Sequence, residues 1–342
     1  MFQLSAPLIV GIIITNKCNL RCVHCINSAH INDEELDYDT IKNIIDQCSE
    51  IGVKYIDING GEIFLFDKLD ELIFYAHSLG LKIIITTNGT LLSESWLKKF
   101  QDKIFLMRIS LDSHLETIHD KFRGQRGCFA KTVHNIEIAN KYNYNITILS
   151  TISKSNYLFI SELVQFVKSL SVNALHTIFL MPTGRGTNLS DAIMNSEDTY
   201  LFLTECEIIR KNLNETNDKF VLLEETPQSI LIKENVDIDR YSKCGAAYVQ
   251  LVITHKGFAI PCGGFLGAGN DFMAEELDIR KHSLKEIYTN SKLFSDIRNI
   301  YNIEGKCKQC EFLKNCGGGC RVAGWLDSKC TNIFAADPFC WQ

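Results

Sequence analysis

Three cysteines near the N-terminus are spaced closely enough to bind one metal centre. Cys18, Cys22 and Cys25 stand in the run Thr-Asn-Lys-Cys-Asn-Leu-Arg-Cys-Val-His-Cys, which begins at Thr15. Thiolates bind iron–sulfur clusters and structural zinc. Clusters that only carry electrons normally take four cysteines, so three thiols round a cubane cluster would leave one iron free for a substrate or cofactor. A zinc loop or buried structural thiols are the alternatives.

A second group of cysteines lies at the other end of the chain. Four of its members have the spacing C-x2-C-x5-C-x3-C. The group consists of Cys244, Cys262, Cys307, Cys310, Cys316, Cys320 and Cys340. A zinc ribbon is the alternative here, because C-x2-C pairs are typical of it, but it would leave the N-terminal triad unexplained.

Composition excludes several classes of protein. With 342 residues and 46% hydrophobic content, the chain can bury a large core and is expected to hold two domains. A net charge of −6 gives no basic surface for nucleic acid. The 14 cysteines are too sparse for a disulfide scaffold, and their grouping at both ends favours metal sites in a reducing cytoplasm. No apolar stretch is long enough to cross a membrane.

Strand-like and helix-like segments alternate through the first half of the chain. The predicted strands are 8–14, 53–58, 82–87, 104–111, 146–152 and 174–180. The predicted helices are 40–51 (capped by Asp39), 69–79, 93–100 (capped by Ser93), 129–142 and 157–170. A helix between successive strands indicates a parallel sheet, and six such units fall short of a closed eight-stranded barrel.

Polar motifs follow three of these strands, where parallel α/β folds place their sites. Gly60-Gly61-Glu62 combines a backbone that a ligand can approach closely with a carboxylate. Asn88 stands in a Thr-Asn-Gly turn, which could equally be a turn without a ligand. Ser110 ends the fourth strand, and Arg123 offers a guanidinium that suits a carboxylate. Asp112 could instead cap the next helix.

The triad and the motifs that follow it resemble the radical S-adenosylmethionine (SAM) family. The resemblance implies a partial (β/α)6 TIM-like barrel over residues 1–187, with a [4Fe–4S] cluster on the triad whose open iron chelates SAM. Reduction then yields a 5′-deoxyadenosyl radical that abstracts hydrogen. Expected SAM contacts are Gly60, Gly61, Glu62, Asn88, Ser110 and Arg123. His24 stands where the family usually has an aromatic residue.

The C-terminal cysteines resemble the SPASM extension of that family, over 244–342. By resemblance, Cys307, Cys310, Cys316 and Cys340 hold an outer auxiliary cluster, and Cys244, Cys262 and Cys320 an inner one. A sulfatase-maturing relative would have a cysteine where Gln250 stands, and an aspartate near Gly263-Gly264, which puts that activity in doubt. The inner cluster then has an open iron or another ligand such as Cys330.

The remaining residues have less definite roles. Residues 188–243 read as a bridge with a helix over 198–214 and a shorter one near Ser229. Cys48 and Cys206 fall on apolar helical faces and are expected to be structural. The sequence assigns no catalytic base and no role for Cys128. Arg185 lies in a Gly-rich loop that resembles one closing an active site, and it is expected, like Gln250, to affect product formation rather than SAM cleavage.

These features predict an oxidoreductase with SAM and three [4Fe–4S] clusters. SPASM enzymes mostly modify ribosomally made peptides, so a peptide is the expected substrate, with a flavodoxin- or ferredoxin-type reductant. Many such maturases have a leader-recognition domain before the barrel, whereas here the first strand begins within ten residues of Met1. A small-molecule dehydrogenase or epimerase, or a tetrapyrrole-modifying enzyme, is the alternative. An iron–sulfur electron carrier would need none of the SAM motifs.

Overall fold

The computed structural model describes residues 4–224, 244–266 and 270–340. Its strands are hydrogen-bonded in the order β7-β6-β5-β4-β3-β2-β1-β8-β9. The six predicted strands are all present, as β1 (Ile9–Thr15), β2 (Tyr55–Gly60), β3 (Lys82–Thr87), β4 (Ile104–Ser110), β5 (Ile146–Ile152) and β6 (Ala174–Phe179). The pairs from β3 through β6 are parallel, which confirms the predicted α/β class.

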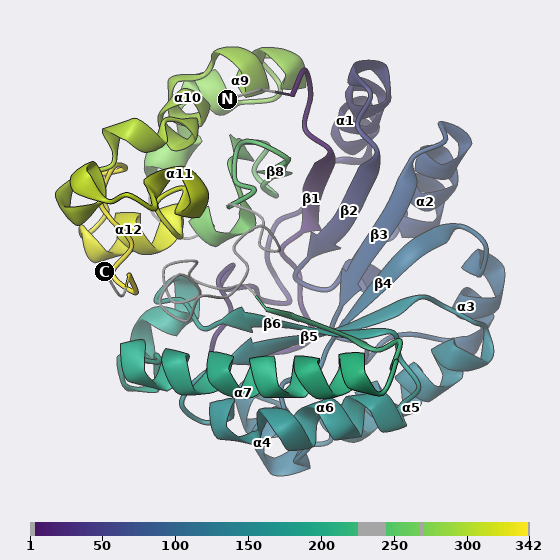
Figure 1. Cartoon of the computed structure of the whole chain (residues 1–342). Helices are drawn as coiled ribbons and strands as arrows, with labels where there is room; N and C mark the ends of the chain where they lie inside the picture. The colour runs from purple at the N-terminus through teal and green to yellow at the C-terminus, as the bar shows by residue number, and fades with distance from the viewer. Residues whose placement is uncertain (1–3, 225–243, 267–269, 341–342) are drawn as a thin grey trace. The chain divides into compact units, whose positions relative to one another are not determined.

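Helices follow the strands as the alternation predicts. They are α1 (Tyr38–Ile51), α2 (Leu69–Ser78), α3 (Glu94–Phe100), α5 (Cys128–Lys141) and α6 (Ile160–Ser169), and Figure 1 shows α2, α3, α5 and α6 outside the strands. Ser93 caps α3 as predicted. The predicted Asp39 cap of α1 is wrong: Asp37 accepts from the Thr40 N–H at 2.8 Å, and the helix starts one turn earlier than its apolar face.

The predictions missed helix α4 (Glu116–Arg123), which is polar apart from a single buried side. Asp112 does not cap it, because Leu115 occupies the N-cap position without a side-chain hydrogen bond. Helix α7 (Ser196–Glu215) agrees with the predicted helix over 198–214. The helix predicted near Ser229 lies outside the described residues.

The two faces of the strands differ in character. Ile83, Ile85, Met107 and Ile109 are fully buried, whereas Thr86, Arg108 and Ser110 are half-buried. Arg108 pairs with Thr86 on one neighbouring strand and with Thr147 on the other, so these side chains share a face. We call this second face, which carries Asp57, Thr86, Arg108, Ser110 and His176, the inner face.

Short elements that the sequence did not reveal complete the chain. They are β7 (Val221–Glu224), β8 (Gln250–Ile253), β9 (Ala259–Ile260), α9 (Leu284–Asn290), α10 (Lys292–Arg298), α11 (Leu313–Cys316) and α12 (Arg321–Asp327). Strand β7 pairs with β6 and β8 with β1, both in parallel, whereas β8 and β9 are antiparallel. These elements do not continue the regular strand–helix alternation that indicated the barrel.

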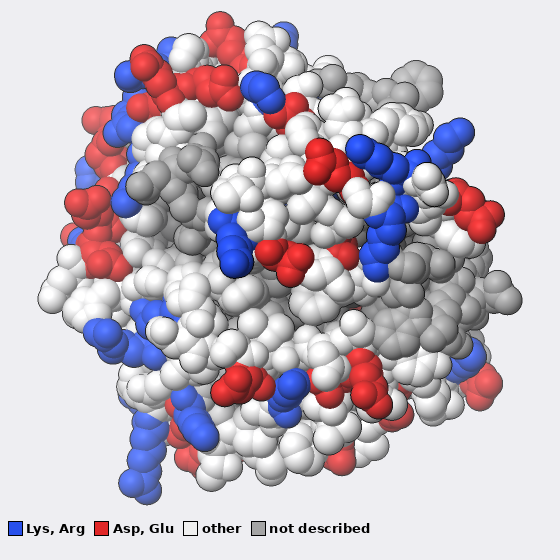
Figure 2. Space-filling model, turned by 90° about the vertical axis from the view of Figure 1, so that its left-hand side faces the viewer, with Lys and Arg blue, Asp and Glu red and all other residues white. Residues whose placement is uncertain are grey.

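The chain divides into two compact units. One comprises Ile14–Glu35 and Asp57–Glu225, and the other Met1–Ile13, Leu36–Ile56 and Thr226–Gln342. On the face drawn in Figure 2, acidic and basic side chains are interspersed, in keeping with the modest net charge of −6. No helix in the described part of the chain combines the length and apolarity that spanning a bilayer requires.

Candidate functional site

The N-terminal thiols lie together in a buried loop. Cys18 and Cys22 are buried, Cys25 is half-buried and packs against them, and Leu20 lies in the same apolar group. The pKa of Cys18 is raised to about 12, first by burial and further by the charges of Cys22, Glu62 and Cys25. The structure therefore brings the predicted triad together, in a setting where neutral thiols are stable unless a cation binds them.

His24 fills the position of the expected aromatic residue by stacking. Its ring lies 4.1 Å from that of Phe122 at an interplanar angle of 17°. Burial lowers the pKa of His24 to about 3, and the positive charge of Arg123 lowers it further. A neutral imidazole can therefore take the place of a phenyl or phenol ring in this loop.

The two glycines after β2 are needed by another part of the backbone. A Cβ atom on Gly60 would lie 2.4 Å from the Thr15 carbonyl oxygen, and one on Gly61 would lie 2.3 Å from that of Lys17. The Gly61 N–H donates to the Thr15 carbonyl at 2.8 Å, and the Glu62 N–H to that of Lys17 at 2.8 Å. The backbone at the start of the cysteine loop thus occupies the space beside these glycines that the sequence analysis assigned to a ligand. Contact of the glycines with SAM stays a prediction.

Glu62 connects this turn to the Thr-Asn-Gly turn after β3. It is fully buried, and its carboxylate accepts from the Thr87 hydroxyl at 2.7 Å and the Asn88 N–H at 2.8 Å. Burial raises the pKa of Glu62, although these hydrogen bonds oppose the shift. Asn88 in turn donates to the Asn19 side chain at 2.9 Å. Both predicted SAM residues therefore position the cysteine loop.

The guanidinium of Arg123 forms a bidentate ion pair with a carboxylate of the protein. Its Nε donates to Oδ2 of Asp112 at 2.6 Å and its Nη2 to Oδ1 at 2.9 Å, while Nη1 lies 3.9 Å from the Cys22 sulfur. Burial alone would raise the pKa of Asp112, but Arg123 and the nearby histidines lower it below its usual range. Arg123 makes a bidentate contact with Asp112, and its predicted contact with the SAM carboxylate stays a prediction.

Arg185 hydrogen-bonds the cysteine loop, and its expected effect on product formation stays a prediction. Its Nε donates to the Cys22 carbonyl at 2.7 Å, and its Nη1 to that of Ala29 at 2.9 Å. Its backbone N–H donates to the Cys25 carbonyl at 3.0 Å. An Arg in a Gly-rich loop gives no sign of this in sequence, because the three acceptors lie about 160 residues earlier.

Sequence reasoning missed a polar cluster on the inner face. Arg108 donates to Asp57 at 2.8 Å, and the Thr86 hydroxyl donates to the same carboxylate at 3.1 Å. Burial, then the charge of Arg108, lowers the pKa of His176 to about 4. Ser110 follows Arg108 by two residues in β4, so that both lie on the same face. It is half-buried, and its hydroxyl forms no hydrogen bond with the described residues. The signal was present: three charged or titratable residues interrupt strands that are otherwise apolar.

The C-terminal thiols form two sets. The pKa of Cys320 is raised by burial and then by Cys244, Asp337 and Cys262. The pKa of Cys307 is raised by burial and then by Cys340 and Cys310. Cys316, whose pKa is about 11, also has Cys340 among the charges nearest to it. Cys244 and Cys262 thus act on Cys320, and Cys340 acts on Cys307 and Cys316, while the assignment of these thiols to two clusters stays a prediction. Gln250 lies on β8, where its side chain passes Gly245 next to Cys244.

The donor chemistry fits iron–sulfur clusters. All 14 cysteines are free of disulfides. In the outer set, the N–H groups of Gly318 and Gly319 are directed at the Cys316 sulfur and lower its pKa against the effect of burial. Amide donors of this kind stabilise thiolates at cluster sites. Within the described residues, no three His, Cys, Asp or Glu side chains converge on one ion position, whereas the thiolates of a cluster surround a volume.

The other cysteines are accounted for in part. Cys48 on α1 and Cys206 on α7 are fully buried, as predicted for structural residues. Cys128 at the start of α5 packs against the N-terminal triad and donates to Asp120 at 3.2 Å. Cys330 follows α12 in a left-handed conformation with φ of 61°.

Comparison with known proteins agrees with this arrangement. A family model described as "Radical SAM superfamily" matches residues 12–168. The AdoMet-dependent heme synthase of Methanosarcina barkeri is 28% identical, over 98% of this chain and 97% of that protein. The antilisterial bacteriocin subtilosin biosynthesis protein AlbA of Bacillus subtilis is 27% identical, over 96% of this chain and 70% of that protein.

Solved structures share the fold. The structure of Streptococcus suis SuiB bound to its precursor peptide SuiA superposes with a TM-score of 0.79, at 22% identity, over 99% of this chain and 77% of SuiB. The structure of anSMEcpe with bound AdoMet gives 0.74, at 21% identity, over 98% of this chain and 94% of that one. The predicted partial barrel with a C-terminal extension is thereby confirmed. Residues 12–168 thus match the radical SAM superfamily, and nearly the whole chain is similar to AdoMet-dependent enzymes.

Proposed function

We propose that the chain is a three-cluster enzyme that removes hydrogen from an unactivated C–H bond of a ribosomally made peptide. The observation that carries this proposal is the division of ten thiols into one set of three and two sets near the C-terminus. Cys18, Cys22 and Cys25 would hold the cluster that binds SAM. The two C-terminal sets would hold one auxiliary cluster each, the inner set with three cysteines and the outer with four.

The residues round the N-terminal set keep its loop in one conformation. Arg185 and the Gly60-Gly61 turn hydrogen-bond its backbone, and Asn88 holds its Asn19 side chain. Ser110 is the predicted SAM contact whose polar side-chain atom is still available for a ligand. We propose that Glu62, Asn88 and Arg123 serve SAM mainly by positioning this loop, with Ser110 and the glycine backbone making direct contact.

The chemistry belongs to the bound groups, and the chain supplies position. A cluster held by Cys18, Cys22 and Cys25 would supply the electron, from a flavodoxin- or ferredoxin-type reductant, that cleaves SAM to methionine and a 5′-deoxyadenosyl radical, and clusters held by the C-terminal thiols would supply an acceptor for the electron left on the substrate. Loss of two hydrogens from the substrate then balances as one hydrogen atom to the radical, one proton to water and one electron to the acceptor.

Two findings support a peptide substrate. AlbA takes part in bacteriocin biosynthesis by its name, and SuiB shares the fold and has been crystallised with its precursor peptide. The inner face offers Arg108, Asp57, Thr86 and His176 as hydrogen-bonding groups in an otherwise apolar surround. Such a surface suits a peptide, whose backbone presents both donors and acceptors.

A tetrapyrrole is the second candidate. The similarity to the heme synthase covers 98% of this chain and 97% of that protein, so nearly every part of each has a counterpart in the other. Arg108 and His176 could equally meet the carboxylates of a porphyrin side chain. This candidate places the same radical chemistry on a different substrate.

Metal analysis tests the three-cluster proposal. Anaerobically reconstituted protein should carry about 12 Fe and about 12 sulfide per chain and no stoichiometric zinc. Replacing Cys18, Cys22 and Cys25 by Ala should remove about one third of the iron and abolish 5′-deoxyadenosine formation. An iron content of about four atoms per chain together with two zinc ions would contradict the proposal. Formation of 5′-deoxyadenosine by the triple variant would contradict it as well.

Substrate assays separate the two candidates. The reduced enzyme with SAM should convert a peptide encoded beside its gene to a product that mass spectrometry finds two hydrogens lighter. Iron coproporphyrin is the matched probe for the alternative. Conversion of the porphyrin, with no change in the peptide, would replace the first candidate by the second.

A further inference from the structure

Arg321, next to the inner-set Cys320, is a buried cation without a carboxylate partner. Its side chain is 2% exposed. It donates from Nη1 to the Ile297 carbonyl at 3.2 Å and from Nη2 to the Ile333 carbonyl, and its Nε has no acceptor. No Asp or Glu in the described part of the chain forms an ion pair with it. A buried charge without a counter-ion is costly, so its presence calls for a physical reason.

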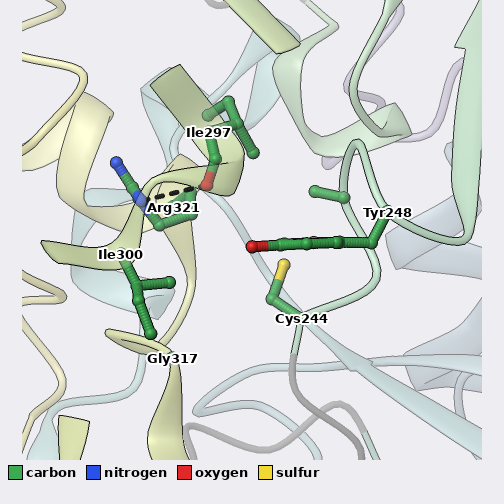
Figure 3. A pocket seen from close by; sticks show the side chains of 7 residues that line it. Cys244, Tyr248, Ile297, Ile300, Gly317 and Arg321 are labelled. Atoms are coloured by element: carbon green, nitrogen blue, oxygen red, sulfur yellow. Dashed lines mark hydrogen bonds between the residues drawn. The ribbon is translucent and has the colours of Figure 1, made fainter. Parts of the chain in front are cut away.

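The charges nearest to Arg321 are thiols of both C-terminal sets. Cys244 of the inner set and Cys307 of the outer set are its two strongest charge neighbours, ahead of Tyr248 and Asp296. Figure 3 shows Arg321 and Cys244 lining one small pocket, with the Cys244 sulfur beside the Tyr248 ring. Gly317, which follows the outer-set Cys316, also lines the pocket. Thiols of both sets are therefore among the charges that act on the guanidinium.

We propose that Arg321 is the counter-charge of the two C-terminal clusters and raises their reduction potential. The inference rests on the proposed function, since it requires clusters on both sets. Thiolate-bound clusters carry negative charge, which increases by one unit on reduction, and net charge is one of the factors that set their potential. A fixed cation in a low-dielectric setting stabilises the more negative, reduced state. Arg321 would thereby favour the C-terminal clusters as electron acceptors.

Asp337 carries the opposite charge in the same region. It is 2% exposed and accepts from the Cys320 N–H at 2.8 Å and the Phe339 N–H at 2.9 Å. Asp337 borders Cys307 and Cys316 of the outer set as well as Cys320, whereas Arg321 has Cys244 as its first neighbour.

The chain offers a matched control in Arg298. It too donates to a carbonyl, that of Ala247 at 2.8 Å, and has an Nη2 without an acceptor. Its guanidinium lies over the Tyr288 ring, 4.3 Å from the centroid, and its charge neighbours are tyrosines rather than thiols. A substitution there removes a half-buried arginine of the same region without removing a charge from the thiols.

The test measures the potential of the C-terminal clusters alone. In protein that lacks Cys18, Cys22 and Cys25, an anaerobic redox titration followed by electron paramagnetic resonance reports only the C-terminal sets. Arg321→Gln should shift the midpoint potential to more negative values while iron and sulfide content stay unchanged. Arg321→Lys should keep the potential of the unsubstituted arginine, and Arg298→Gln should leave it unshifted.

Every outcome of this titration either supports or overturns the proposal. An unshifted potential in Arg321→Gln, or a shift as large in Arg298→Gln, overturns the proposal. If Arg321→Gln loses its iron, Arg321→Lys distinguishes an electrostatic role from a structural one. Lysine keeps the positive charge but cannot hydrogen-bond both carbonyls in the geometry of arginine. Iron and potential like those of wild type support the electrostatic role, and loss of either overturns it in favour of a structural one. No iron in the starting background would instead overturn the three-cluster function itself.

Discussion

Arg123 and Asp112 form a two-pronged ion pair that is almost completely buried, and the third nitrogen of the guanidinium lies against the Cys22 sulfur. Asp112 also accepts the Thr151 N–H at 3.0 Å, so the pair joins the ends of β4 and β5 to the cysteine loop. A guanidinium committed in this way acts as a fixed positive charge beside the triad.

Replacing Asp112 by Asn should destabilise the protein strongly. The substitution leaves the Arg123 charge buried without its counter-ion, and removing one partner of such a pair typically costs about 3–5 kcal/mol. Denaturant unfolding of the reduced apoprotein should show a clearly lower midpoint. Glu275→Gln breaks the exposed pair with Lys281 and should leave the midpoint unchanged. Equal midpoints for the two variants would show that the buried pair does not hold the fold.

Arg185→Gln should abolish SAM cleavage even without substrate. The variant removes two hydrogen bonds from a charged donor to the cysteine loop, each worth about 1.5–3 kcal/mol. Iron content should fall by the share of one cluster, and 5′-deoxyadenosine should fall with it. Arg126→Gln, at an exposed arginine, is the control. Normal 5′-deoxyadenosine formation with lost product would restore the substrate-side role that the sequence suggested.

Gly61→Ala should prevent cluster loading. The added Cβ would meet the Lys17 carbonyl carbon at 2.7 Å and its oxygen at 2.3 Å, and neither backbone atom can move without shifting Cys18. Gly80→Ala is a useful comparison, since Gly80 has a φ of +75° but nothing within 4 Å of its Cβ position. Iron analysis should find the N-terminal cluster lost only in Gly61→Ala. Full iron in that variant would mean that the loop tolerates displacement.

The double variant Asp57→Asn/Arg108→Gln should uncouple SAM cleavage from product formation. Removing both charges together avoids leaving either one buried alone. We expect product to fall by about tenfold or more while 5′-deoxyadenosine formed without substrate is retained. Lys99→Gln, at an exposed position on the outer helix α3, should change neither quantity. A parallel loss of both quantities would place the pair in support of the SAM site instead.

The elements of the barrel could be predicted because each is long and strongly periodic. The run Lys82–Thr87 has the same bounds in sequence and structure, and Ser93 is a cap in both. The spacing of the cysteines showed the N-terminal triad, whereas the division of the C-terminal cysteines into two sets was implied by the resemblance to the SPASM extension. The spacing of residues cannot show which distant atom a polar side chain contacts. Arg123 could contact either SAM or Asp112. Arg185 could face either the solvent or the Cys22 carbonyl. Those choices depend on contacts between segments 11 to 163 residues apart.

The support of the cysteine loop by Arg185 has a consequence for biogenesis. A chain emerging from the ribosome presents its three N-terminal thiols long before the residues that hold them, because Arg185 lies 163 positions after Cys22. Turns at Gly61 and Asn88 arrive earlier, but Gly184, whose Cβ position lies 2.4 Å from the Cys25 carbonyl oxygen, arrives together with Arg185. Iron delivered to the nascent chain would meet thiols in an unformed loop. Cluster insertion should therefore follow translation past residue 185, as a late, post-translational step in maturation.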